Sequence, residues 1–310
     1  TKIIYEESDE AWVDLFQLGD TYAIDYTNSF SFLKDSNSVL WASEKDGWRH
    51  LYQVSLEGKP EVLITKGEYD VIDLKYIHNR DGFLYYIASP DNATQKYLYK
   101  TKLNGKGKNE LLSPISLKGS HDYSFSSNGN YAEHTFSNHF TPNSKEFISI
   151  ANHKALTDKE SILKNIKKLE EKPTTEFFTI TTADNVEMDG WMVKPTNFDP
   201  SKKYPVVFYV YSEPARATVI DSYNTSRNSL YIGDMAEDGY IYISLDNRGT
   251  PSPKGREWRK SIYRKIGMIN INDQAMAAKE ILNWDFIDPE RVAVWGWSGG
   301  GSATLNLMFQ

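Results

Sequence analysis

A serine flanked by glycines near the end of the sequence has the residue types and spacing of a hydrolytic nucleophile. Residues 296–300 read Gly-Trp-Ser-Gly-Gly, the G-x-S-x-G pattern of a nucleophile elbow. In such an elbow a tight turn joins a strand to a helix, and glycines are needed where side chains would collide with neighbouring backbone. The pattern therefore predicts that Ser298 stands at the mouth of a sheet with its hydroxyl exposed.

A serine hydroxyl becomes an effective nucleophile when a base removes its proton and an acid orients that base. In folds with this elbow, the acid and then the histidine follow the serine along the chain. No Asp or Glu follows Ser298 here, and all six histidines precede it, at positions 50, 78, 121, 134, 139 and 153. We therefore expect this chain to be a piece of a longer enzyme and to have negligible hydrolytic activity alone.

Composition excludes several classes of function. The histidines are scattered through the first half of the chain and none has a carboxylate at ligand spacing, so we expect no metal site and no cofactor. The absence of cysteine excludes disulfides and thiolate-bound metals. A net charge of −7 argues against nucleic-acid binding, and no run is apolar enough to span a membrane.

The first half of the chain consists of repeated short strand patterns. The pairs Leu51-Tyr52, Leu98-Tyr99 and Phe147-Ile148 recur 47 and 49 residues apart. Repeats of this length with several strands each indicate β-propeller blades, and a generic antiparallel sandwich is the alternative. Residues 1–155 are therefore predicted to be a partial β-propeller of about three blades. Because three blades cannot close a ring, we expect the other blades to lie upstream or in another chain.

The pattern changes after residue 155, and at 310 residues two domains are expected. Apolar residues at 162, 163, 166 and 169 form a helical stripe that Pro173 ends, so residues 156–173 are predicted to be a linker helix. Residues 174–310 then alternate between strands and helices, which is typical of an α/β fold. The expected strands are 176–182, 188–195, 204–211, 240–246 and 292–295, and the expected helices are 228–238 and 272–284.

The elbow with its preceding strand and following helix resembles the α/β-hydrolase fold. With the propeller in front, the chain resembles the prolyl oligopeptidase family, in its dipeptidyl peptidase IV-like branch. On this resemblance, residues 174–310 are the N-terminal part of an α/β-hydrolase domain that stops just after the elbow. The resemblance runs in the family's order through residues 58–67, 199–205, 210–214, 245–249, the helix beginning Asn272-Asp-Gln, and 294–300.

The resemblance implies a serine peptidase that releases N-terminal dipeptides after proline or alanine, with Ser298 as the nucleophile. Its oxyanion hole would pair the backbone N–H of Gly299 with the Tyr211 hydroxyl, and Phe16 would face the peptide substrate. A homodimer and a secreted, periplasmic or cell-envelope location are also implied. The alternatives are an acylaminoacyl peptidase or oligopeptidase of the same family, or a non-enzymatic propeller interaction module with a decayed hydrolase domain.

Several positions depart from the family pattern or have another interpretation. Gly299 replaces a frequent tyrosine, and Ser212-Glu213-Pro214 replaces a glycine-rich turn. The pairs at 6–7 and 170–171 are interpreted as surface charge, because the amine-anchoring glutamates of the family would lie upstream. Arg248 and the basic run 254–265 are interpreted as a solvated or substrate-rim loop.

Overall fold

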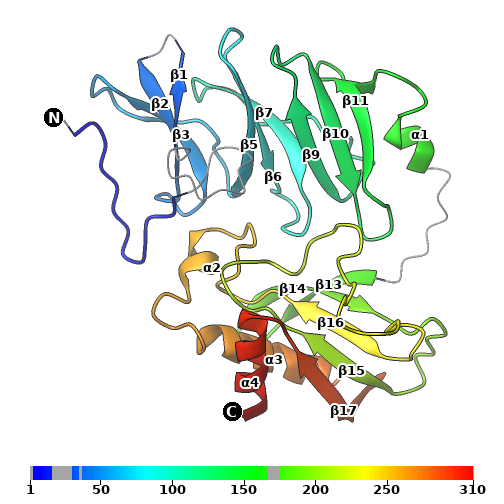
Figure 1. Ribbon diagram of the computed structural model, residues 1–310. Helices are drawn as coiled ribbons and strands as arrows, with labels where there is room; N and C mark the ends of the chain where they lie inside the picture. Colours follow the sequence, from blue (N-terminus) through cyan, green and yellow to red (C-terminus); the bar gives the residue numbers. More distant parts are fainter. Residues whose placement is uncertain (1–2, 16–29, 35–36, 167–174, 310) are drawn as a thin grey trace. The chain divides into compact units, whose positions relative to one another are not determined.

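The structure is a computed structural model that describes residues 3–15, 30–34, 37–166 and 175–309. It divides into two compact units (Figure 1). Unit 1 comprises Thr1–Phe136, Asn143–Leu169 and Pro253–Glu257, and unit 2 comprises Ser137–Pro142, Glu170–Ser252 and Trp258–Gln310. Within the described ranges, no helix has both the length and the apolar character needed to cross a bilayer.

Unit 1 contains three four-stranded antiparallel sheets. In each sheet the strands follow one another from edge to edge in sequence order, as in propeller blades (Figure 1). The first has β1 (Phe30–Leu33), β2 (Ser38–Ser43), β3 (His50–Ser55) and β4 (Val62–Leu63), and the second has β5 (Val71–His78), β6 (Phe83–Ala88), β7 (Tyr97–Lys102) and β8 (Glu110–Leu111). The third has β9 (Ser120–Phe125), β10 (Tyr131–Ser137), β11 (Ser144–Ser149) and β12 (Lys154–Ala155).

Alternating side chains of these strands form the cores between successive sheets. Leu40 and Leu51 of the first sheet pack with Leu84 and Tyr86 of the second. The other face of the second sheet packs on the third sheet and forms another core, which includes Leu98, Tyr123 and Ile148. Of the linker helix predicted over 156–173, only α1 (Ile162–Ile166) is helical among the described residues, and residues 156–160 form bends and turns. Ile162 packs on Leu117 and Phe136. Residues 167–174 lie outside the described residues.

Unit 2 is built on one five-stranded sheet with the order β13-β14-β16-β15-β17. The hairpin β13 (Thr175–Thr181) and β14 (Glu187–Val193) is antiparallel, and β14 is antiparallel to β16 (Ile241–Leu245). The strands β16, β15 (Tyr204–Tyr209) and β17 (Ile287–Trp295) are parallel to one another. The predicted strands are thus confirmed, and the near-continuous apolar runs form the buried parallel part.

The helices that follow these strands are α2 (Arg256–Lys260), α3 (Ile269–Ile281) and α4 (Gly299–Phe309). Ala277 and Ile281 of α3 pack against Val206 and Ile243 of the sheet, which confirms the helix predicted over 272–284.

The helix predicted over 228–238 is wrong, since this segment forms turns. The Asp234 carboxylate accepts from the backbone N–H groups of Ala236 and Glu237, and the Asp238 carboxylate accepts from that of Asp234. Aspartate side chains that bond nearby backbone in this way compete with helical hydrogen bonds.

Candidate active site

Ser298 occupies a strained turn between β17 and α4. Its φ of 57° lies in the left-handed region, where a side chain other than glycine costs about 1–3 kcal/mol. Around it, the N–H of Gly300 donates to the Trp297 carbonyl at 2.9 Å, and the N–H of Gly301 donates to the Ser298 carbonyl at 2.9 Å. Ser298 is exposed. This geometry is that of a nucleophile elbow, with the serine presented to solvent.

The elbow packs tightly against the residues that follow β15. A Cβ built on Gly296 or on Gly300 would overlap the carbonyl oxygen of Val210, so both positions require glycine. The same Cβ on Gly300 would lie 3.2 Å from the Cα of Tyr211. The elbow therefore rests directly on the Val210–Tyr211 backbone.

Tyr211 reaches the elbow because β15 and β17 are parallel neighbours, with Tyr209 paired to Trp295. The carboxyl ends of parallel strands meet at one edge of a sheet, where sites of α/β proteins form. Tyr211 is half-buried there, and Gly299 begins α4 with its backbone N–H in the first turn. The structure thus brings Ser298, Gly299 and Tyr211 together at this edge.

Ser212, directly after Tyr211, also has a left-handed backbone, with a φ of 69°. The side-chain amide of Asn270 donates to the Ser212 carbonyl at 3.0 Å and approaches its hydroxyl at 3.3 Å. The Asn270 carbonyl oxygen in turn accepts from the N–H of Gly267 at 2.8 Å. Buried Asn270, at the start of α3, therefore fixes the turn that carries Tyr211, although nothing in the sequence pattern singled it out.

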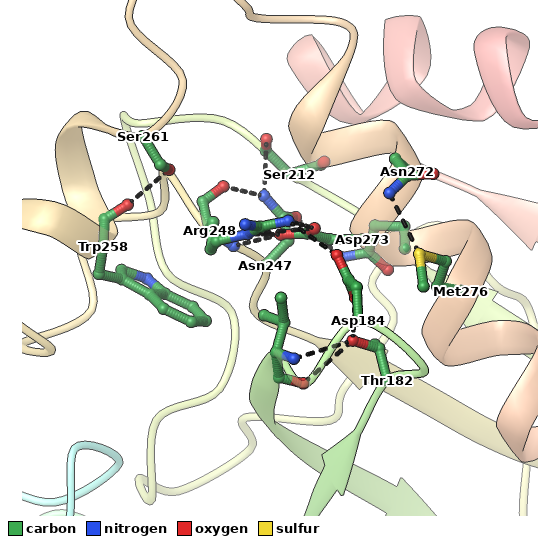
Figure 2. Close-up of polar contacts among 12 residues, drawn as sticks. Thr182, Asp184, Ser212, Asn247, Arg248, Trp258, Ser261, Asn272, Asp273 and Met276 are labelled. Atoms are coloured by element: carbon green, nitrogen blue, oxygen red, sulfur yellow. Dashed lines mark hydrogen bonds and ion pairs between the residues drawn. The ribbon is translucent and has the colours of Figure 1, made fainter.

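An ion pair joins the loop after β16 to α3 (Figure 2). Arg248 donates to the carboxylate of Asp273 through Nε at 3.0 Å and through a terminal nitrogen at 2.6 Å. Asp273 is fully buried, and its carboxylate also accepts from the backbone N–H of Arg248. Gln274 adds bonds to the Leu245 carbonyl and to the Asn247 side chain. Two motifs that carry the family resemblance, 245–249 and the start of 272–284, are therefore joined in space.

The buried carboxylate of Asp246 holds the segment after the Tyr211 turn. It accepts from the N–H groups of Thr218 and Val219 at 2.8 and 3.0 Å, and from the hydroxyls of Thr218 and Ser252 at 2.9 and 3.1 Å. Burial raises the pKa of Asp246, while these four donors act in the opposite direction.

A cavity of about 440 Å³ in unit 2 is lined by Trp297, the neighbour of Ser298. Its walls combine aromatic and polar side chains, with Arg216 and Arg227 as cationic lining residues. A cavity of this size next to an elbow has room for one or two side chains of a peptide. The other aromatic lining residues are Tyr209, Tyr223, Tyr242 and Trp295.

Comparisons with known proteins agree with this geometry. A family model described as "Dipeptidyl peptidase IV (DPP IV) N-terminal region" matches residues 1–143, and one described as "Prolyl oligopeptidase family" matches residues 226–310. The chain is therefore similar to a fragment of a dipeptidyl peptidase IV-like member of the prolyl oligopeptidase family. Its sheets in unit 1 are accordingly blades of a β-propeller, and unit 2 is the start of an α/β-hydrolase domain.

Individual relatives cover almost the whole chain. Dipeptidyl peptidase 4 of Trichophyton equinum is 28% identical over 97% of this chain and 39% of its own length. Dipeptidyl peptidase 4 of Arthroderma otae is 28% identical over 92% and 37%. The crystal structure of Porphyromonas gingivalis dipeptidyl peptidase 4 superposes with a TM-score of 0.80 at 30% identity, over 99% of this chain and 41% of that one. The chain thus spans about two-fifths of the length of these relatives.

The two departures from the family pattern near the serine, at Gly299 and at Ser212-Glu213-Pro214, lie in contact with each other. A Cβ on Gly299 would overlap the carboxylate of Glu213, including its Cδ and both oxygens. Glu213 therefore fills the space where family members carry a side chain after the serine. Sequence reasoning treated the two positions separately, because nothing in the sequence shows that they touch.

Histidines that the sequence shows as scattered and without a carboxylate at ligand spacing do contact carboxylates in the structure. In unit 2, Nδ1 of His139 lies 2.9 Å from a carboxylate oxygen of Asp221, and in unit 1, Nδ1 of His134 lies 2.8 Å from Glu146. Strand pairing and loop packing join these residues across 82 and 12 positions of sequence. Among the described residues, no histidine hydrogen-bonds to Ser298.

Other sequence interpretations also change. Arg248 is held by Asp273, Arg256 is held by Asp9, and Arg259 and Lys260 are buried, so these residues are not solvated charges. The Glu7 carboxylate accepts hydrogen bonds from the side chains of Tyr5, Trp41 and Ser43, so it is not free surface charge. Phe16 and the pair at 170–171 lie outside the described residues.

Proposed function

We propose that this chain supplies the nucleophile and the oxyanion hole of a serine peptidase that releases N-terminal dipeptides after proline or alanine. The observation that carries the proposal is Ser298 at a φ of 57° in an elbow packed on the Tyr211 backbone. The names of the relatives, dipeptidyl peptidase 4, support the proposed substrate class.

In the proposed reaction, Oγ of Ser298 attacks the scissile carbonyl carbon and its proton passes to a general base. The carbonyl oxygen becomes an oxyanion that accepts from the Gly299 N–H and the Tyr211 hydroxyl. The amine leaves with the proton from the base, and water then hydrolyses the acyl-enzyme. We propose that the base and its acid follow residue 310, in the order that this fold uses.

The test uses the full-length protein, a Gly-Pro chromogenic substrate and a fluorophosphonate probe. We expect turnover, labelling at Ser298, and loss of both in Ser298→Ala. Tyr211→Phe should still be labelled at Ser298, but its kcat should fall by about 10²–10³-fold because one oxyanion donor is removed. The chain of 310 residues alone should be inactive because it lacks a general base. A rate within about tenfold of that of a full-length relative would contradict this expectation.

The same assay separates the alternatives. Turnover of N-acetylated substrates in place of free-amine dipeptides indicates an acylaminoacyl peptidase, and cleavage inside longer peptides indicates an oligopeptidase. A full-length protein that is neither labelled nor active with any of these substrates contradicts the proposal and favours a propeller interaction module.

A further inference from the structure

A compact group of titratable side chains lies inside the third sheet of unit 1, and the proposed reaction makes no use of it. Its members come from β9, β10, β11 and the turn after β11. His121, His134 and Glu146 are 2%, 0% and 4% exposed. His134 is paired across the strands with Glu146. We call this group the histidine cluster: His121, Tyr123, His134, Glu146 and His153.

Hydrogen-bond directions in the cluster follow from one backbone carbonyl. Nε2 of His121 lies 2.7 Å from the Leu117 carbonyl, which accepts only, so Nε2 carries hydrogen. In the neutral form, which is the form that binds a metal ion, each imidazole ring has one N–H and one lone pair. Nδ1 of a neutral His121 is then an acceptor, and Nε2 of His134, at 2.9 Å, must donate to it.

This arrangement leaves the other nitrogen of His134 without hydrogen. Its Nδ1 lone pair faces an oxygen of Glu146 at 2.8 Å. The second oxygen of Glu146 accepts from the backbone N–H of Ile162 at 2.9 Å. Two acceptors this close in a buried site repel each other unless a cation lies between them. That cation is either a proton or a metal ion.

A third ligand stands beside this pair. His153 offers a ring nitrogen, and the ligand atoms of His134, Glu146 and His153 all lie within 4.8 Å of one another. Nε2 of His153 meets the Tyr123 hydroxyl at 2.8 Å. Its Nδ1 is buried and has no hydrogen-bond partner among the described residues. A proton shared by His134 and Glu146 leaves this nitrogen unused, whereas a metal ion would use a third ligand.

We propose that His134, Glu146 and His153 bind a divalent transition-metal ion, with Zn²⁺ the best match to the donor set. Two imidazoles and one carboxylate are ligands that zinc takes in proteins, whereas calcium and magnesium prefer oxygen alone. Ligands around tetrahedral zinc stand about 3.3 Å apart, so the 2.8 Å between His134 and Glu146 must open by about half an ångström.

The surroundings have the hydrogen bonds that usually orient metal ligands. A ligating histidine commonly donates its other N–H to a fixed acceptor, as His134 does to His121 and His121 to the Leu117 carbonyl. The non-ligating oxygen of Glu146 is held by the Ile162 N–H at the start of α1. With three protein ligands, the ion would tie β10, β11 and the following turn to one another and leave a fourth position open.

The experiment measures metal content in the full-length protein after chelator treatment and reloading with Zn²⁺. His153→Phe and Glu146→Gln should each lose one zinc per chain relative to wild type, or bind it on the order of 100-fold more weakly. Cobalt substitution should give the visible absorption of a low-coordinate Co²⁺ site in wild type only. His121→Phe should weaken binding by about 10- to 100-fold, because it removes only the support of His134.

His139→Asn is the matched control, since His139 also pairs with a carboxylate but lies in unit 2. It should keep the zinc of wild type. Equal zinc content in wild type and His153→Phe overturns the proposal and leaves the shared proton as the cation of the cluster. His153 is only partly buried, so its variant keeps the test decisive even if Glu146→Gln fails to fold.

Discussion

Glu213 and Gly299 stand 86 positions apart in the sequence, yet the carboxylate of Glu213 occupies the space beside the Gly299 backbone. The Gly299 N–H is the proposed oxyanion donor, so a negative charge stands next to the place where negative charge develops in the reaction. Like charges at short range raise the free energy of such a transition state. The Glu213 carboxylate thus works against the proposed chemistry.

This placement gives a prediction for Glu213→Gln in the full-length protein. The substitution keeps the shape and removes the charge, so kcat/KM for a Gly-Pro substrate should rise by roughly fivefold, equivalent to about 1 kcal/mol. Glu176→Gln, at an exposed position of β13, is the control and should change nothing. A fall in kcat/KM for Glu213→Gln would show instead that the carboxylate binds the substrate.

At the scale of elements, the apolar runs of β15 and β16 and the amphipathic pattern of α3 were sufficient to predict the parallel core of unit 2. The elbow was predictable because its chemistry lies within five consecutive residues. The support of the Tyr211 turn was not, since Asn270 comes from a helix 58 positions away and asparagine has no characteristic spacing there. Contacts between distant segments depend on packing, which a single sequence does not reveal.

Asn270 is therefore a positioning residue, and its removal should affect the chemical step. Asn270→Ala removes the donor to the Ser212 carbonyl and the acceptor for Gly267, which should cost about 1–3 kcal/mol of stability. We expect kcat to fall on the order of 10- to 100-fold with KM nearly unchanged, because the Tyr211 hydroxyl is displaced from the oxyanion. Asn272→Ala, at an exposed neighbour on α3, should behave as wild type. An unchanged kcat for Asn270→Ala would contradict the role.

At the scale of the whole molecule, the division into two compact units was expected from the change of pattern along the chain, although the segments 137–142 and 253–257 group with the unit that the sequence does not suggest. The unit to which a short loop belongs depends on packing contacts, and these leave no periodic signal in the sequence. The homodimer and the location outside the cytoplasm stay predictions that follow from the family resemblance alone.

The division into two units determines which part of the protein a metal ion in the histidine cluster can stabilise. A ligand that binds only the folded state adds about 2.7 kcal/mol at a concentration 100 times its Kd, and that gain belongs to the unit that opens around the ligand. All the proposed ligands lie in unit 1. Saturating Zn²⁺ should therefore slow amide hydrogen exchange in β9–β11 by roughly 100-fold, while β13–β17 stay unchanged. His153→Phe should abolish the protection. If Zn²⁺ protects both units equally, they open as one cooperative body and the ion stabilises the whole chain.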